Sequence, residues 1–150
     1  MSRWVFLRRK LGGMEFVCDK NPPAVIPDGI YEAVCFKHDE AYLFKSLKLF
    51  LHFEIISPAE YKGIKIQMYF NMPVNRRLAQ GSKYYKTWVM VNDWKQPSRN
   101  TKMSPKLFKN KVFRVKTFKA KPKHNGKEMP ESQQYSKVEE IVEVITGART

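Results

Sequence analysis

Hydrophobic and polar residues alternate most regularly over residues 47–71, and this stretch predicts a β-hairpin. Apolar residues stand at every second position of 47–55 and again of 64–70, and residues 57–63 join the two segments. Because successive side chains of a strand point to opposite faces, one face of this hairpin is apolar throughout. We expect that face to contribute to the core.

The opposite face of the same hairpin combines aromatic and basic residues. Lys48, Phe50 and His52 fill the other positions of the first strand, and Lys65 and Tyr69 those of the second. Aromatic platforms beside positive charge are typical of proteins that bind single-stranded nucleic acid with little sequence preference. We interpret this mixed face as a binding surface. The alternative is that Phe50 and Tyr69 pack in the core, beneath a helix or an N-terminal hairpin.

Three further segments predict strands. They are residues 30–37, which the polar residues 38–40 end, residues 112–121, and residues 135–145 after a loop over 122–134. The three glutamates of the last segment also fit a helical period, so a closing helix stays open as an alternative.

The long segment after the hairpin predicts one short helix. Ser82 is a suitable N-cap for a helix over 83–91. Ser104 and Pro105 fit the start of a single turn over 106–108.

The resulting order, β-β-β-α-β-β, predicts a mainly β fold. It suits a five-stranded Greek-key barrel of the OB (oligonucleotide/oligosaccharide-binding) type, with one helix between strands 3 and 4. In such barrels, strands 2–3 and the flanking loops form the ligand face. We expect residues 1–150 to form a single OB-like nucleic-acid-binding domain, with residues 1–25 as a short N-terminal hairpin or basic arm.

Positive charge is concentrated in one part of the chain. The 150 residues include 28 Lys plus Arg against 14 Asp plus Glu, a formal net charge of +14. Between residues 61 and 127 there are eighteen basic side chains and a single acidic one, Asp93. Because a hydrated surface normally mixes the two signs, this excess indicates a polyanionic partner. An acidic protein or a membrane surface is the alternative.

The candidate nucleic-acid-binding residues combine the mixed face of the hairpin with basic residues of later segments. They are Lys48, Phe50, His52, Lys65, Tyr69, Arg76, Arg77, Lys83, Arg114, Lys116, Lys119 and Lys121.

Catalytic and metal-binding patterns are absent from the sequence. It has no nucleophile elbow, phosphate-binding loop or HExxH motif, and its acidic residues are too dispersed for a two-metal nuclease. The only carboxylate expected near His52 is Glu54 on the same strand. Cys18 and Cys35 lack metal-ligand spacing and are expected to be small buried residues. We therefore expect no enzyme activity, cofactor or metal.

The expected surroundings are cytoplasmic, in a bacterial cell or an infected host cell. No apolar run approaches the ~18 residues of a membrane span. The first residues lack the pattern of a secretory signal. We therefore expect no contact with a membrane.

Three short motifs lie within residues 26–120. Pro27, Gly29 and Tyr31 form a P-x-G-x-Y motif at the first strand. The approach to the third strand and the start of the fourth carry the other two, made by Tyr61, Gly63, Lys65 and Ile66 and by Asn110, Phe113 and Val115. These motifs resemble those of a phage and mobile-element family of single-stranded-DNA-binding-like proteins with an OB fold, although Asn110 replaces a glycine. Residues 1–25 and 74–110 lie outside the resemblance.

The resemblance implies sequence-tolerant binding of displaced single-stranded DNA during replication or recombination of phage or other mobile DNA. A homo-oligomer and a replication or recombination protein are further partners compatible with it. Two alternatives stay open. One is a small basic inhibitor that binds an acidic host protein surface, and the other is an OB protein that binds RNA.

Overall fold

A computed structural model of the protein describes residues 24–43, 45–120, 123–124, 127–128 and 135–147. The predicted N-terminal hairpin or arm lies outside the described residues, apart from residues 24 and 25. The candidate binding residue Lys121 also lies outside them.

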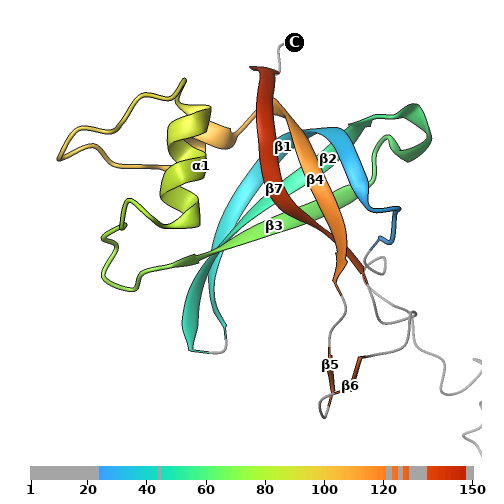
Figure 1. Cartoon of the computed structure of the whole chain (residues 1–150), viewed down its shortest axis with the longest axis horizontal. Coiled ribbons are helices and arrows are strands. Elements are labelled where there is room, and N and C mark those ends of the chain that lie inside the picture. The colour runs from blue at the N-terminus through green and yellow to red at the C-terminus, as the bar shows by residue number, and fades with distance from the viewer. Residues whose placement is uncertain (1–23, 44, 121–122, 125–126, 129–134, 148–150) are drawn as a thin grey trace, which may run out of the picture.

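Five long strands form one antiparallel sheet in the order β3-β2-β1-β4-β7 (Figure 1). They are β1 (Gly29–Leu43), β2 (Ser46–Ser57), β3 (Lys65–Met72), β4 (Lys111–Ala120) and β7 (Tyr135–Gly147). The sheet curls so that its edge strands β3 and β7 come into contact, but no hydrogen-bonded ladder joins them in the described part of the chain. The fold is therefore mainly β and barrel-like, and we call the gap between β3 and β7 the seam.

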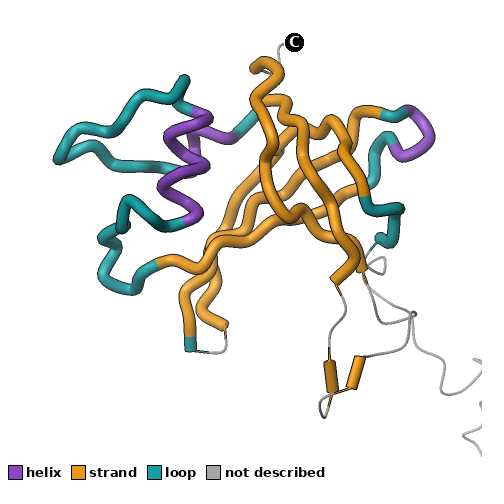
Figure 2. Tube along the Cα trace, in the orientation of Figure 1, coloured by secondary structure: helices purple, strands orange, loops and turns teal. Residues whose placement is uncertain are grey.

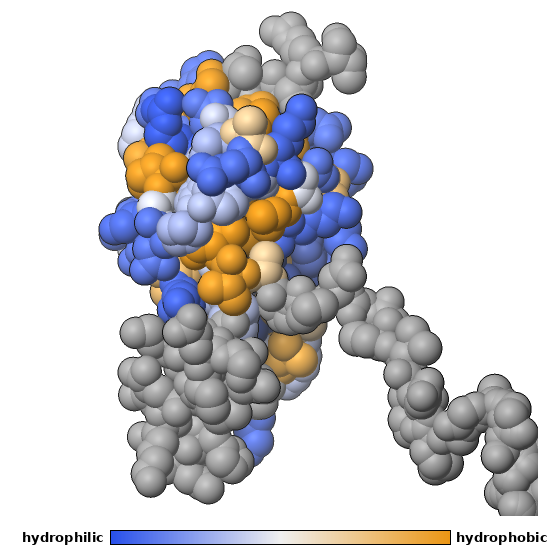
Figure 3. All heavy atoms as spheres, turned by 90° about the vertical axis from the view of Figure 1, so that its right-hand side faces the viewer, coloured by the Kyte–Doolittle hydropathy of each residue, from blue (hydrophilic) through white to orange (hydrophobic). Residues whose placement is uncertain are grey.

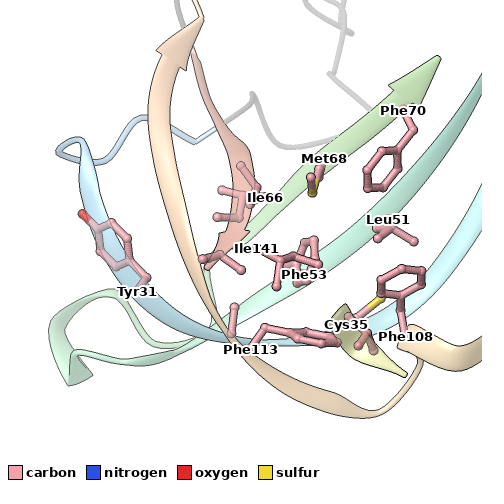
Figure 4. Close-up of a cluster of buried hydrophobic side chains, with 14 of the residues drawn as sticks. Tyr31, Cys35, Leu51, Phe53, Ile66, Met68, Phe70, Phe108, Phe113 and Ile141 are labelled. Carbon is pink, nitrogen blue, oxygen red and sulfur yellow. The ribbon is translucent and has the colours of Figure 1, made fainter. Parts of the chain in front are cut away.

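The apolar face of the predicted hairpin lies inside this barrel. Leu49, Leu51 and Phe53 of β2 are almost completely buried, as are Met68 and Phe70 of β3. Figure 4 shows Leu51, Phe53, Met68 and Phe70 converging with labelled residues of β1, β4 and β7 on one interior. The period-two alternation thus predicted the inner face of both strands correctly.

The helix α1 (Lys83–Val91) begins where the sequence predicts it. The Ser82 hydroxyl accepts a hydrogen bond from the backbone N–H of Tyr85 at 3.2 Å, which satisfies one of the free donors of the first turn. The buried Tyr84 ring packs against Phe70, with the ring centroids 5.2 Å apart. The helix therefore attaches to the end of β3.

A short 3₁₀ helix, η2 (Pro105–Phe108), follows as predicted, with Ser104 as its cap. Its Phe108 is fully buried and touches both Tyr84 and Phe113. Figure 2 shows the helix and the long loops between β3 and β4 gathered on one side of the strands. This side covers one end of the barrel.

The strand limits correct two expectations and confirm that the last segment is a strand. β1 does not end at residues 38–40 but continues to Leu43, because residues 37–43 pair with β2 as far as Ser46. The last segment is the strand β7 and not a helix, since it pairs with β4 along its length. The segment 122–134, expected to be a loop, contains the paired two-residue strands β5 (Lys123–His124) and β6 (Lys127–Glu128).

Two of the sequence motifs meet in the structure and support the fold. The Tyr31 hydroxyl donates a hydrogen bond to the Pro27 carbonyl at 2.5 Å, and the Tyr31 ring packs edge-on against Tyr61 at 5.6 Å. Gly63 has a φ of 90°, which favours glycine, and its N–H donates to the Ile55 carbonyl. These motif residues therefore shape turns and packing.

One end of the barrel exposes apolar side chains around the 3₁₀ helix η1 (Ala59–Tyr61). Ile30 and Ile56 are 51% and 36% exposed, and both lie close to this end of the sheet. Figure 3 shows hydrophobic residues gathered among hydrophilic ones on the corresponding face.

Candidate nucleic-acid interface

The mixed face of the hairpin lies on the outside of the barrel. Phe50 and Tyr69 are direct cross-strand partners, their ring centroids are 6.2 Å apart, and both side chains are partly exposed. Each alternates with buried residues of its own strand. Neither ring belongs to the core of the described residues, so the alternative of packing beneath the helix is wrong. The alternative of packing beneath an N-terminal hairpin lies outside the described residues.

Two lysines place their ammonium groups over the Tyr69 ring. The Nζ atoms of Lys48 and Lys137 lie 4.5 Å and 4.4 Å from its centroid, and the Lys48 Nζ also donates to the Asn71 Oδ1 at 2.7 Å. A cation–π contact at an exposed site contributes ~0.5–1 kcal/mol, whereas a stacked base contributes ~1–3 kcal/mol. A base stacked on Tyr69 would therefore contribute more than either cation–π contact with this ring.

Lys137 reaches this ring across the seam and joins an aromatic group there. Its Nζ lies 5.9 Å from the ring centroids of both Phe118 and Tyr135. Burial, followed by the neighbouring charges of Lys48 and Lys83, lowers the pKa of Lys137. Lys48 and Lys83 repel the charged form of Lys137. An anion at this position would offset that repulsion, because a negative charge favours the protonated ammonium.

The seam itself forms a shallow pocket of about 380 Å³. Tyr69, Lys83, Phe118 and Lys137 line it, and the Lys83 Nζ donates to the Glu139 carbonyl at 2.5 Å. Lys83 thereby links α1 to β7. We call Lys48, Tyr69, Lys83, Phe118 and Lys137 the seam cluster, since the last four line this pocket and the Lys48 ammonium lies over the Tyr69 ring beside it.

The other end of the mixed face is organised around His52. The His52 Nε2 lies 3.1 Å from the Asp39 Oδ2, so the carboxylate beside this histidine comes from β1 and is not the expected Glu54. The ring centroids of Phe36 and His52 are 6.1 Å apart, and the Lys65 Nζ lies 5.6 Å from the centroid of the Phe36 ring. Phe36, Phe50 and Tyr69 thus provide rings from three neighbouring strands.

Arg114 and Lys116 point outward from β4 but are neutralised by acidic neighbours. Arg114 forms ion pairs with Glu143 and, at 3.6 Å, with Glu32, and the Lys116 Nζ lies 3.7 Å from Glu139. The register of β4 with β1 and β7 brings these charges together. The prediction that both residues are available to phosphates is therefore not supported.

The remaining candidates are dispersed. The Arg76 guanidinium donates two hydrogen bonds to the Glu40 carboxylate in a bidentate pair, with N–O distances of 3.0 and 3.1 Å. This hydrogen bonding raises the pKa of Arg76. Arg77 is exposed beside a cleft near α1, and Lys119 is partly exposed opposite Ser136. Arg76, Arg77 and Lys119 thus lie away from the mixed face. The candidates that lie on or beside it are Lys48, Phe50, His52, Lys65, Tyr69 and Lys83.

Sequence reasoning missed Phe36, Phe118, Tyr135 and Lys137. The sequence could have indicated that Phe36 and Lys137 face outward, because each stands next to a buried residue in an alternating strand. It could not have indicated the contact of Phe36 with His52 or that of Lys137 with Tyr69, since these contacts depend on strand pairing and on the curl of the sheet.

The described residues contain no group of three or more His, Cys, Asp or Glu arranged to hold a metal ion. Cys35 is buried as expected, and this burial raises the pKa of its thiol to about 11, so it is a poor nucleophile. None of the helices in the described part of the chain is long and apolar enough to cross a membrane.

No protein-family model matches the chain, and no curated protein matches it in sequence. The resemblance to phage and mobile-element single-stranded-DNA-binding-like proteins therefore stays a prediction from three short motifs. The functional argument depends on the geometry of the mixed face and the seam.

Proposed function

We propose that this protein binds single-stranded DNA with little sequence preference, on the outer face of β2 and β3 and across the seam. The observation that carries the proposal is the seam cluster beside Phe50. It combines partly exposed rings with three ammonium groups, which are the two requirements for sequence-tolerant binding.

In the proposed mode, Phe50 and Tyr69 stack bases, and the lysines contact the phosphates between them. Lys48 and Lys137 already share the Tyr69 ring, and Lys83 lies in the adjoining pocket. Phe36 extends the row of rings toward β1 through its contact with His52. A row of rings on three strands suits successive bases of one strand better than a rigid duplex.

We further propose that the barrel is an OB fold. The strand order β4-β1-β2-β3 matches the 4-1-2-3 arrangement of a Greek key, and α1 lies between the third and fourth long strands. The tip of the β1–β2 hairpin and the β5–β6 pair both extend below the barrel in Figure 1. These correspond to the two loops that flank the ligand face of OB folds.

The proposed process is replication or recombination of phage or other mobile DNA in the cytoplasm. It rests on the motif resemblance together with the seam cluster. We propose DNA ahead of RNA as the ligand, and the protein acts by binding and not by catalysis.

The test is a titration of a labelled ~20-nucleotide DNA at several salt concentrations. Affinity should fall with a log–log slope of about −0.7 for each phosphate that the protein neutralises. RNA and duplex DNA of the same length are the matched competitors. Absence of binding at low salt would refute the proposal, and a preference for duplex would refute base stacking.

A further inference from the structure

A second concave surface lies on the other side of the β2–β3 ribbon. A cleft of about 760 Å³ opens between the end of this ribbon, the start of α1 and the segment 97–105. Its volume falls within the range of sites that hold a small ligand or a short peptide. The cleft is separate from the seam cluster.

The floor of the cleft is aliphatic. Met72, Leu78 and Met103 line it and pack against the core while remaining partly exposed, and Leu47 extends it toward the β1–β2 hairpin. Tyr42 pairs with Leu47 and is 62% exposed, so it continues the apolar surface. Methionine side chains adapt their shape to different apolar partners.

The rim of the cleft is basic. Arg77, Arg99 and Lys102 are exposed around it, and the described residues provide no ion-pair partner for any of the three. The acidic residue of the lining is Glu40, which Arg76 already neutralises. The cleft therefore presents an apolar floor inside a positively charged edge.

This combination suits a peptide better than a nucleic acid. The Tyr84 ring is buried and its hydroxyl donates to the Met103 carbonyl, while the Tyr85 hydroxyl donates to Gln96. Tyr85 is therefore the only partly exposed ring among the described lining residues, and the floor is mainly aliphatic, whereas a nucleic-acid site typically offers several flat rings for stacking. Leucine or phenylalanine side chains fill such a floor, and carboxylates complement such a rim.

The two surfaces use opposite faces of the same strand. Leu47 and Leu49 face the cleft, whereas Lys48 and Phe50 face outward on the mixed face. A ligand on one surface therefore leaves the other surface accessible.

We propose that this cleft binds a short acidic peptide segment of a partner protein, one that carries large apolar side chains between its carboxylates. The inference is independent of the proposed function. It gives the protein a way to recruit a protein partner while the mixed face stays free.

The experiment is selection from a random dodecapeptide display library on the full-length protein. The cleft variant is Arg77→Glu with Arg99→Glu. The matched control is Lys62→Glu with Lys109→Glu, which makes the same change in charge at exposed positions outside the cleft. The wild type and the control should enrich peptides that combine Asp or Glu with Leu, Ile or Phe.

The cleft variant should bind the most enriched peptide at least tenfold more weakly than the control does. Leu78→Asn tests the floor and should also weaken binding, with a thermal melt to confirm that this variant folds. Failure to enrich acidic peptides would overturn the proposal. Equal peptide affinity in the cleft variant and the control would overturn it too.

A competition with a 20-nucleotide thymidine DNA separates this site from the proposed function. The peptide should stay bound when the DNA is added. If the DNA displaces the peptide, and does so in the Tyr69→Ala variant as well, the cleft binds nucleic acid and the peptide proposal is overturned. Failure of the DNA to bind anywhere would refute the proposed function and leave the peptide result standing.

Discussion

The outer surface of the barrel carries basic side chains in two regions whose surroundings differ. On β4, Arg114 and Lys116 lie against the carboxylates of β1 and β7. At the seam, Lys48 and Lys137 lie over the Tyr69 ring, and no ion pair neutralises either one within the described residues.

The difference shows that a count of basic residues does not locate a binding surface. The β4 lysine and arginine belong to the most basic part of the sequence, yet their partners cancel most of their field. Lys137 lies outside that part, in a segment whose net charge is negative, and still faces Lys48 and Lys83. A basic side chain without an acidic neighbour contributes more to the positive field that attracts a phosphate than one in an ion pair does.

The largest expected effect tests the two faces of β2. Phe53→Ala should reduce the free energy of unfolding by about 3–5 kcal/mol, because Phe53 is fully buried and packs edge-on against Phe113. Phe50→Ala, on the outer face of the same strand, should cost about 1 kcal/mol or less. Urea denaturation measures both. Equal losses would mean that Phe50 also belongs to the core.

Removal of the central ring of the seam cluster should give the largest loss of DNA affinity. Tyr69→Ala should weaken binding by ~1–3 kcal/mol, which is roughly 5- to 150-fold, because a stacking platform is lost. Tyr42→Ala is the matched control, since Tyr42 is exposed on the opposite side of the sheet. Fluorescence anisotropy with a ~20-nucleotide DNA compares them, and similar losses in both variants would exclude Tyr69 as a platform.

The two basic regions should differ in their salt dependence. Lys48→Gln with Lys137→Gln should reduce the steepness of the log–log salt slope by about 1.4, since each lysine neutralises about one phosphate. Arg114→Gln with Lys116→Gln removes the same formal charge from β4 and should leave the slope nearly unchanged. A larger change for the β4 pair would reverse our assignment of the interface.

The smallest expected effect concerns pH. Because the pKa of Lys137 is lowered, its ammonium loses its proton at a lower pH than an ordinary lysine, whose pKa is about 10.4. DNA affinity should therefore decline as the pH rises toward that range, before the exposed lysines titrate. Lys137→Arg should retain its affinity there, because guanidinium stays charged. The pH profiles of DNA affinity are measured at constant ionic strength for the wild type and for Lys137→Arg. If the two profiles are parallel, Lys137 contacts no phosphate.

Several features were predictable because they depend on neighbouring residues. The alternation over 47–71 identified both faces of β2 and β3, and the capping serines located α1 and η2. The same alternation placed Phe50 and Tyr69 on the face opposite the apolar one, but their partial exposure was decided by the tertiary structure, because no helix of the described residues covers that face. The exact extent of β1 was not predictable, since residues 38–40 are polar and the segment 38–43 becomes a strand only through pairing with β2.

The sequence by itself therefore determined the mainly β class, the order of the long strands and the helix, and which residues of β2 and β3 share a face. The tertiary structure decided which outward charges are neutralised and which meet a ring. It placed Lys137 over Tyr69, although 68 positions separate them in the numbering, and it set Arg114 beside Glu143. Such contacts depend on strand register and on the curl of the sheet, which bring distant residues together. The proposed interface at the seam depends on that curl.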